Sequence, residues 1–473
     1  MKRVVVVGGG LGGLASAALI GRAGHRVTLL EANSWLGGKS RRIELDGQRV
    51  DTGPAIVTFP GVWDKLLERW DALGDGAGSS AKEVAELRLE RQAEVGTYYY
   101  RDEVCSLPIQ EGHLWREAWD RFVAMHGGLG PDVTRLLTTD WYEPEIRPAL
   151  VRLFKLYGTK LTTRGYLNSL EWVPEGLREI LAIHTLNAGV SPSRTPALYA
   201  SMPAVMAVDG VWVPEGGVYE IVRSLEKLAR VGGVEIKTAE PASRIGAGKV
   251  ITDKGAYPAD AVVSGLDAGR LGELLEPGRP QTVGRLSCSG VVIYTSLRDA
   301  LPAHLAPHSV VLPSKPDALY ASLEARKEPD ETMAFVDYYR PGTPYPNDES
   351  VLALGLTAPA NSREYGLDDA FVRREVERVS RTIGLQRPMM EYFGESEVLH
   401  PRHFGVWGSP GGALYGEARP FWRSGPFHRP RYSDRKRPWL WRVGASVHPG
   451  GGVPAVLGGA LICTSRLLRF LAK

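Results

Sequence analysis

The sequence predicts an α/β fold with a parallel sheet and a dinucleotide-binding βαβ unit at its start. Residues 3–7 (RVVVV) form a β-branched run, as expected of a parallel strand buried on both faces. The segment GGGLGG follows, and residues 14–24 (LASAALIGRAG) then have the small and apolar residues of a packed helix. Residues 25–31 (HRVTLLE) predict a second buried strand. The short connections place the two strands side by side in one sheet.

Composition excludes several classes of protein. A chain of 473 residues can form two large structural units, and its apolar and charged fractions are ordinary for a globular protein. The net charge of +3 is too small to indicate nucleic acid, so we expect no nucleic-acid partner. Cys105, Cys288 and Cys463 lack C-x-x-C spacing, and the ten histidines lack a metal-ligand pattern. We therefore expect no metal site, and three buried thiols in a reducing compartment.

The N-terminus and the apolar segments bear on location. The apolar run in MKRVVVV is too short for the core of a signal peptide, and no small-residue cleavage site follows it. No window of about 18 continuous apolar residues is present, so we predict no membrane-spanning helix. We expect a cytoplasmic protein. The sequence gives no indication of the oligomeric state.

Gly8, Gly10 and Gly13 form G-x-G-x-x-G between the predicted strand and helix. The first glycine permits the tight turn, the second lets the backbone approach a pyrophosphate, and the third lets helix pack on strand. Leu11 opens the helix, whose unpaired N–H groups attract an anion. Glu31 ends the second strand, where a carboxylate can accept hydrogen bonds from a ribose hydroxyl. The pattern predicts a dinucleotide site.

A second glycine pair distinguishes between cofactors. Gly37 and Gly38 follow Glu31 within one loop, and Lys39 comes next, where its charge can meet a phosphate. This doublet is typical of FAD proteins that resemble the amine oxidase and phytoene desaturase superfamily, whose usual pattern is R-x-G-G-R-x-x-S. Trp35, Lys39 and Arg42 replace three of its polar positions. A plain surface turn is the alternative.

The C-terminal region carries an independent signal. Gly444 ends a predicted strand, and residues 448–454 (HPGGGVP) lead into the last helix, aiming its N-terminus at an electron-rich group such as the flavin pyrimidine oxygen. We expect Ala445, Gly452 and Val453 to contact the cofactor. Many flavoproteins have Gly-Asp at such a strand end, but this chain has Gly444-Ala445-Ser446, without the acid.

The middle of the chain divides into two parts. Residues 74–81 (GDGAGSSA) predict a flexible loop, and residues from about 110 to 205 have helical patterns. The segments 291–297, 309–313, 332–339 and 350–357 predict strands that are largely antiparallel.

Four stretches resemble the bacterial carotenoid desaturases of the phytoene desaturase type. The most specific is the C-terminal G-A-S-x-H-P-G-G-G-V-P. The others are Asp51-Thr52-Gly53-Pro54, the turn at residues 210–217 (GVWVPEGG), and the segment from Cys288 to Tyr294 with His308 beyond it. The resemblance runs from Lys2 to about Leu468, so it covers nearly the whole chain.

The resemblance implies a Rossmann-like FAD-binding domain of the glutathione-reductase/amine-oxidase type with an inserted α+β substrate domain. The FAD-binding domain would be discontinuous, and the rest would bind substrate and face the membrane. We expect its segments at 1–75, 205–275 and 436–473, and those of the substrate domain at 76–204 and 276–435. Gly53, Pro54 and Ala242 are further expected cofactor contacts.

The resemblance also implies FAD-dependent desaturation of an acyclic carotenoid, such as phytoene or a later, hydroxylated intermediate, by hydride transfer to flavin. His448 and Glu215 are the candidate catalytic residues, each weighed against a structural role, and His308 is a weaker candidate. A long apolar polyene needs an apolar tunnel. Its candidate lining residues are Leu186, Val190, Trp212 and Tyr415, each of which can equally be plain core.

Three other functions stay open. A redox-neutral, flavin-dependent carotenoid isomerase would carry the same motifs. A non-catalytic isoprenoid-binding protein of the same fold predicts degraded glycine motifs, whereas Gly8, Gly10, Gly13, Gly37 and Gly38 are all present. An amine oxidase usually links its flavin covalently through a C-terminal cysteine, but Cys463 lies inside the predicted last helix.

Two basic stretches contain interleaved aromatic and aliphatic residues. Residues 146–170 carry five Lys and Arg side chains and no acid before Leu170, and residues 419–442 carry eight against Asp434 alone. Such composition suits an interfacial patch on anionic lipid, and a solvated basic face is the alternative. We expect peripheral attachment to the inner face of the membrane.

Overall fold

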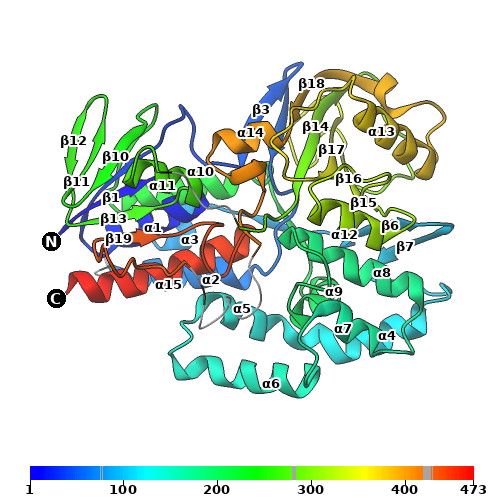
Figure 1. Cartoon of the computed structure of the whole chain (residues 1–473), viewed down its shortest axis with the longest axis horizontal. Coiled ribbons are helices and arrows are strands. Elements are labelled where there is room, and N and C mark those ends of the chain that lie inside the picture. The colour runs from blue at the N-terminus through cyan, green and yellow to red at the C-terminus, as the bar shows by residue number, and fades with distance from the viewer. Residues whose placement is uncertain (75, 77, 280–283, 419–427, 429) are drawn as a thin grey trace.

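The computed structural model describes residues 1–74, 76, 78–279, 284–418, 428 and 430–473 (Figure 1). The chain forms two lobes. The left lobe in Figure 1 contains both termini and a parallel sheet, and the right lobe contains a larger sheet above a group of helices.

The sheet of the left lobe is parallel throughout, with strand order β19-β13-β1-β2-β9. β1 lies at its centre, with Val5 paired to Thr28 on one side and to Val262 on the other. The strands come from three distant parts of the chain: β1 (Arg3–Val7), β2 (Arg26–Leu30), β9 (Glu235–Lys237), β13 (Ala261–Ser264) and β19 (Leu440–Arg442).

The two faces of this sheet are covered differently. Val4 and Val6 join a core cluster with α1, which packs on α10 and α15. Val5 and Val7 join a second cluster under a three-stranded antiparallel sheet, β10-β11-β12. The covering elements are α1 (Leu11–Arg22), α2 (Gly61–Leu73), α3 (Ala81–Ala85), α10 (Glu220–Val231), α11 (Ala268–Leu275), α15 (Val453–Leu471), β10 (Ala242–Gly246), β11 (Lys249–Thr252) and β12 (Gly255–Pro258).

The sheet of the right lobe has seven strands in the order β18-β14-β17-β16-β15-β6-β7. All neighbours are antiparallel except β15 and β6. Its elements are β6 (Gly96–Tyr100), β7 (Glu103–Leu107), β14 (Ser289–Leu297), β15 (His308–Val311), β16 (Ala334–Tyr339), β17 (Val351–Ala358), β18 (Phe393–Leu399), α12 (Pro316–Glu324), α13 (Ala370–Thr382), η5 (Met389–Tyr392), α14 (Pro401–Val406) and η6 (Pro410–Gly412).

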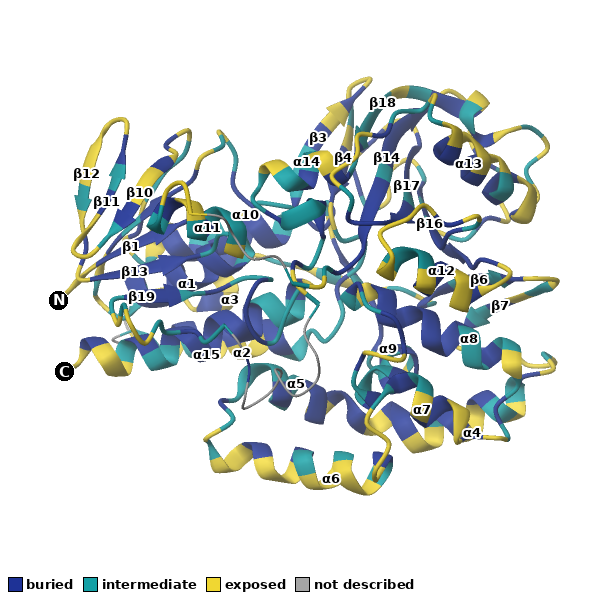
Figure 2. Cartoon of the chain, in the orientation of Figure 1, coloured by how far each residue is buried: buried dark blue, intermediate teal, exposed yellow. Residues whose placement is uncertain are grey.

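Helices fill the lower part of the structure; α5 packs on α15 and α2 of the left lobe, and α6 lies below α5 along the lower edge with a mostly exposed outer face (Figure 2). They are α4 (Arg116–His126), η1 (Gly127–Leu129), α5 (Gly130–Thr138), η2 (Pro144–Ile146), α6 (Arg147–Tyr157), α7 (Thr163–Asn168), α8 (Glu175–Ile183), η3 (His184–Ala188), η4 (Ala197–Ser201) and α9 (Met202–Asp209). Two ribbons complete the fold: β3 (Arg41–Leu45) with β4 (Gln48–Thr52), and β5 (Leu89–Arg91) with β8 (Trp212–Pro214).

The predicted βαβ unit, the helical middle and the antiparallel strands are confirmed. Two elements lie across the predicted domain limits: α3 packs on α10 of the left lobe, and α9 packs on α4 of the right lobe. The limits themselves stay a prediction. In the described residues, Cys105, Cys288 and Cys463 are buried free thiols, and no three His, Cys, Asp or Glu side chains form a potential metal site.

One described helix, α15, is long and apolar enough to cross a membrane by length and composition alone. No membrane-spanning helix was expected from the sequence, which has no window of about 18 continuous apolar residues. In the structure 56% of its apolar window is buried. Leu457, Ile462 and Leu467 lie in the core cluster beneath the parallel sheet, so the apolar face of α15 is covered by protein.

Candidate functional site: a glycine cradle at the sheet end

The turn from β1 to α1 is shaped by its glycines. Gly8 has a φ of +100°, which a side chain would strain, and a Cβ at Gly13 would overlap the carbonyl oxygen of Gly8. Gly10 caps α1, whose first turn has neither a side-chain cap nor an acidic residue. The first N–H groups of α1, beginning at Leu11, therefore have no side-chain acceptor, and an anion fits there.

Glu31 is fixed beside this turn. One carboxylate oxygen accepts from the N–H of Gly9 at 2.7 Å, and the other accepts from the backbone N–H and the side-chain amide of Asn33 at 2.9 and 2.6 Å. A carboxylate offers about four acceptor sites. Glu31, 5% exposed, thus retains capacity for a ribose hydroxyl at the end of β2.

The second glycine loop lies directly against the first. The N–H of Gly37 donates to the carbonyl of Gly9 at 2.8 Å, and a Cβ at Gly38 would lie 3.2 Å from the Cα of Gly10. A Cβ at Gly10 would meet nothing closer than the Cα of Gly38, at 4.0 Å. The outer side of Gly10 is therefore open, as close approach of a phosphate requires.

The C-terminal loop (residues 444–452) reaches the same place from the other end of the chain. A Cβ at Gly12 would lie 3.0 Å from the nitrogen of Gly444 and 3.2 Å from Val456 in the first turn of α15. Gly452 caps α15, again without a side-chain cap or an acid in the first turn. We call Gly10, Gly38 and Gly444 the glycine cradle. Two helix N-termini without side-chain caps accompany it.

Lys39 is joined to the C-terminal loop by an aspartate that the sequence analysis missed. Its Nζ lies 3.0 Å from Oδ2 of Asp267, and the hydroxyl of Ser446 donates to Oδ1 of the same residue at 3.0 Å. Asp267 follows β13, so its carboxylate stands beside the strand end that lacks the usual acid. Its position after an adjacent parallel strand is the signal that could have identified it.

The loop after the second glycine pair is held by a different set of contacts. Arg42 donates to both oxygens of Asp51, at 2.7 and 3.1 Å, and to Glu220 at 2.9 Å. Tyr294 accepts from the N–H of Gly53 at 2.9 Å. Arg42, which departs from the family pattern, is thereby committed to protein contacts. Gly53 packs against the backbone of Lys39: a Cβ at Gly53 would be 2.8 Å from the Lys39 carbonyl oxygen.

The remaining expected contacts are placed as follows. Pro54 follows Gly53 and is partly buried, and Ala242 is buried at the start of β10, in a core cluster that includes Leu30 of β2. Ala445 is partly buried and Val453 buried at the two ends of the C-terminal loop.

The candidate catalytic residues differ in their surroundings. Glu215 is 61% exposed and pairs with Arg88 at 3.6 Å, which gives no support to a role as a base. His448 is buried, and its Nε2 accepts from the indole N–H of Trp141 at 3.0 Å. His308 contacts Asp337 at 2.8 Å across the β15–β16 pair, as a cross-strand partner.

The four candidate tunnel residues come from three segments: Leu186 and Val190 belong to the helical part, Trp212 to β8, and Tyr415 to the segment after η6. Leu186 is buried in the core of the helical part, and Val190 follows Gly189, whose Cβ would lie 2.7 Å from the ring of Tyr415. Tyr415 also covers Gly451 of the C-terminal loop. The backbone of Trp212 is paired with that of Val57.

Val57 leads to an apolar slot that the sequence analysis missed. The slot is narrow, with a volume of about 10 Å³, and hydrocarbon side chains from α2, β5, α10, α15 and the loops before α2 and β5 line most of it, including Val57, Phe59, Trp63, Ile221 and Val453. Phe59 has a φ of +52°, which is rare for an aromatic residue and common near functional sites. The apolar run after Asp51-Thr52-Gly53-Pro54 was the available signal.

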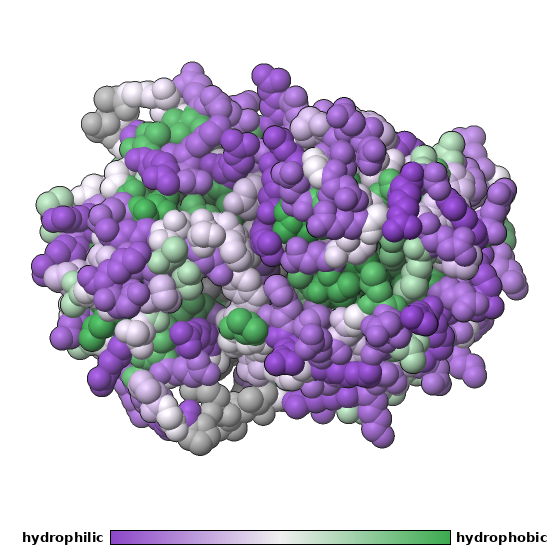
Figure 3. Space-filling view, turned by 90° about the horizontal axis from the view of Figure 1, so that it is seen from above, coloured by the Kyte–Doolittle hydropathy of each residue, from purple (hydrophilic) through white to green (hydrophobic). Residues whose placement is uncertain are grey.

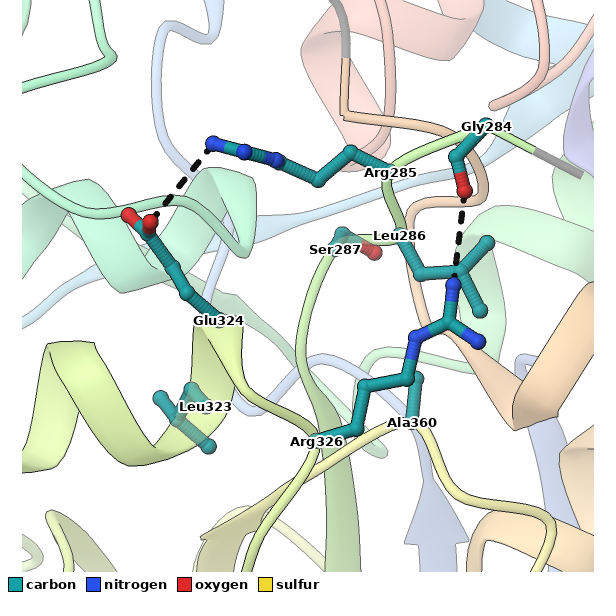
Figure 4. Close-up of a pocket in the computed structure, with 8 residues that line it drawn as sticks. All are labelled: Gly284, Arg285, Leu286, Ser287, Leu323, Glu324, Arg326 and Ala360. Carbon is teal, nitrogen blue, oxygen red and sulfur yellow. Dashed lines mark hydrogen bonds and ion pairs between the residues drawn. The ribbon is translucent and has the colours of Figure 1, made fainter.

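A larger cavity of about 260 Å³ is polar (Figure 4). Arg285 reaches Glu324 at 3.5 Å, Arg194 reaches it at 2.8 Å, and Arg326 donates to the carbonyl of Gly284 at 3.4 Å. Such a charged rim does not suit a hydrocarbon polyene.

Comparisons with known proteins agree with this geometry. Residues 6–70 match the family model described as an NAD(P)-binding Rossmann-like domain. A zeta-carotene-forming phytoene desaturase of Myxococcus xanthus is 28% identical over 99% of this chain and 94% of its own length. A 4,4'-diapophytoene desaturase of Staphylococcus aureus is 25% identical over 99% of both chains.

A solved structure supports the fold alone. Cyclohexylamine oxidase from Brevibacterium oxydans superposes over the whole of both chains with a TM-score of 0.61 at 13% identity. The predicted fold class, a Rossmann-like domain of the amine-oxidase type with an inserted α+β domain, is confirmed. The chain is therefore an oxidoreductase that resembles the bacterial phytoene-type carotenoid desaturases over its whole length.

Proposed function

We propose that the chain binds FAD at the glycine cradle and desaturates an acyclic carotenoid. One observation carries the proposal. Glycine loops from both ends of the chain meet at Gly10, Gly38 and Gly444, in a protein similar over its whole length to two named carotenoid desaturases.

The residues present fit FAD. The start of α1 offers N–H groups without side-chain acceptors, and the outer side of Gly10 is open. The pyrophosphate would bind there, the ribose at Glu31, and the flavin near Val453 at the start of α15. The second glycine pair favours FAD over NAD(P), since it gives the dinucleotide a second backbone contact.

Bound FAD supplies the hydride acceptor for desaturation. The chain's own residues would hold the polyene and exclude water. The apolar slot beside Val453 offers hydrocarbon contacts, but its volume is only about 10 Å³, so a methyl-branched chain would have to displace the side chains that line it. Desaturation removes a hydride and a proton from adjacent carbons. Conjugation spreads the positive charge of the carbon chain, so proton loss needs no strong base, in keeping with the exposed Glu215.

Two of the alternatives are weakened by the geometry. Cys463 is 1% exposed within α15, well past Gly452, so it does not suit a covalent flavin link of the amine-oxidase kind. The glycine contacts between residues 8–13 and 37–38 are intact, which argues against a non-catalytic isoprenoid-binding protein. A redox-neutral isomerase would use the same site and is separated from a desaturase only by its products.

We further propose that α6 attaches the protein peripherally to the inner face of an anionic membrane. Val151 and Phe154 are 54% and 73% exposed, one helical turn apart on one side of α6. Arg147, Arg152 and Lys155 lie exposed among them. Exposed apolar side chains flanked by basic ones suit insertion at anionic headgroups. The opposite face, seen from above, is mostly hydrophilic, with apolar residues in smaller recessed areas (Figure 3).

The second predicted basic patch falls partly outside the described residues. Arg419, Arg423, Arg429, Phe421, Trp422 and Phe427 belong to it there. Of the described members, Arg437 and Arg442 pair with Asp434, so these two charges are partly used within the protein.

Product analysis tests the reaction. The purified protein with FAD is incubated with phytoene, neurosporene and hydroxylated carotenoids in liposomes, and the products are separated by chromatography. A desaturase yields a product two hydrogens lighter for each turnover. An isomerase yields a product of unchanged mass with a shifted retention time, and no conversion of any polyene contradicts both.

A further inference from the structure

We propose that Trp141 is a positioning residue, which holds the imidazole of His448 in the C-terminal loop neutral, with its proton on Nδ1. Its meaning for catalysis rests on the proposed FAD site, but the geometry stands on the contacts alone. Neither residue's role follows from the glycine motifs.

The hydrogen bond fixes the tautomer. The indole Nε1 of Trp141 lies 3.0 Å from Nε2 of His448, and the two ring centres are 6.1 Å apart. An indole N–H can only donate, so Nε2 must accept and cannot carry a proton. A neutral imidazole whose Nε2 accepts a hydrogen bond through its lone pair carries its one proton on Nδ1.

The surroundings of His448 hold the ring in place. His428 stacks on it with centres 5.0 Å apart and planes at 21°. Tyr432 donates to the carbonyl of His448 at 2.8 Å, and a Cβ at Gly459 of α15 would lie 3.0 Å from the same oxygen. His448 itself is 9% exposed. The ring therefore has little freedom to change partners.

A charged pair anchors the segment that carries Trp141. Asp140 accepts from Nε and Nη2 of Arg466 at 2.5 and 2.6 Å, and Arg469 lies 3.7 Å away. Burial pushes the pKa of Asp140 up, but the hydrogen bonds and charge of Arg466 outweigh it, and the net pKa is lowered. The charged carboxylate thus clamps the α5–α6 connection onto α15. The guanidinium of Arg466 faces Tyr432, 5.4 Å from its ring centre.

The arrangement joins two features of the proposed function. Trp141 lies in the connection to α6, the proposed membrane helix, while His448 belongs to the loop that leads into α15. A charge beside a flavin changes its reduction potential. By keeping His448 neutral, Trp141 keeps a positive charge away from the cradle, and it ties the position of the C-terminal loop to that of α6.

Nitrogen NMR of the full-length protein labelled with ¹⁵N-histidine tests the tautomer without flavin. His448→Asn assigns the signals. We expect an unprotonated Nε2 and a protonated Nδ1 in the wild type at neutral pH. In Trp141→Phe, which keeps an aromatic ring but removes the donor, both nitrogens should show protonation that varies between about pH 5 and 8. A protonated Nε2 in the wild type would overturn the proposal, even if the variant did not fold.

The FAD-loaded protein provides the second measurement. Flavin absorbance recorded across the same pH range should change with pH in Trp141→Phe and lose that change in the double variant with His448→Asn. Trp172→Phe, a second indole in the helical part, serves as the matched control and should behave as the wild type. An identical pH response in the wild type and Trp141→Phe would contradict the role assigned to Trp141. Failure to bind FAD would instead contradict the proposed function, and the NMR result would still decide the tautomer.

Discussion

The ammonium group of Lys39 lies 3.0 Å from the carboxylate of Asp267, across residues that are far apart in sequence. Ser446 donates to the same carboxylate at 3.0 Å, so one acid connects the second glycine loop with the C-terminal loop. The strand end at Gly444 lacks its own acid, and Asp267 supplies a carboxylate from the loop after the neighbouring strand β13. A charge-assisted link of this kind fixes both loops around the cradle.

Replacing Asp267 with Asn should weaken FAD binding. The change leaves Lys39 without its counter-ion and loosens Ser446, and hydrogen bonds to charged groups contribute about 1.5–3 kcal/mol. We expect FAD affinity to fall by about 10- to 100-fold, measured by flavin fluorescence during titration of the apoprotein. Asp299→Asn, at an acid that is 61% exposed and remote in sequence from the glycine loops, should leave affinity unchanged. Equal affinities in the two variants would show that Asp267 does not support the cofactor.

Gly10 and Gly13 belong to one motif, but replacing each of them with Ala should have different effects on folding and on FAD binding. A Cβ at Gly13 would overlap the Gly8 carbonyl oxygen, so Gly13→Ala should misfold or lose several kcal/mol of unfolding free energy. A Cβ at Gly10 meets nothing closer than 4.0 Å, and its φ of −68° suits alanine. Gly10→Ala should therefore fold but bind little FAD. Circular dichroism and flavin content distinguish the two outcomes, and a Gly10→Ala protein with full flavin content would refute a phosphate site there.

Membrane attachment through α6 should depend on Phe154 and on charge. Exchanging Phe154 for Ser removes a side chain that is 73% exposed, at little cost in stability. We expect co-sedimentation with phosphatidylglycerol liposomes to fall several-fold, and to fall further at high salt. Val406→Ser, at another highly exposed apolar residue, is the matched control. An equal loss of liposome binding in both variants would show that α6 is not the element that docks on the membrane.

Two buried histidines should make the protein less stable in mild acid. Burial lowers the pKa of His126 and of His184 to about 4. Below about pH 6.5 these two histidines bind protons in the unfolded chain but stay neutral in the folded chain. The free energy of unfolding therefore falls as the pH falls from about 6.5 towards 4. Each group contributes at most about 1.4 kcal/mol per pH unit over that window.

His184→Gln tests this linkage, since Gln does not titrate and can still bond the hydroxyl of Tyr98. Urea unfolding at several pH values should show a shallower slope for this variant. His304→Gln, at an exposed position, should keep the wild-type slope. An unchanged slope in His184→Gln would mean that this ring is protonated in the folded protein.

The parts of the fold that could be predicted are those with local patterns. The valine run before Gly8 and the helix after it are visible because a strand buried on both faces and a packed helix each have their own periodicity. The β10–β12 sheet was not foreseen, since its strands are four or five residues long and mostly exposed on one side.

The site was predictable only where a motif is contiguous. Gly37 and Gly38 indicate a second loop in the sequence, and in the structure that loop lies against Gly10. Asp267, Phe59 and Trp141 carry no motif of their own, because their positions depend on which strands and helices become neighbours. The four tunnel candidates were chosen for apolar character alone, which buried core residues such as Leu186 share.

Anaerobic mixing of the FAD-loaded protein with a carotenoid in liposomes tests the central claim most directly. The absorbance of oxidised flavin should bleach in step with the appearance of one new double bond per flavin, with phytoene or a more desaturated substrate. Product formation without net bleaching would indicate an isomerase. No bleaching and no product with any polyene would contradict the account.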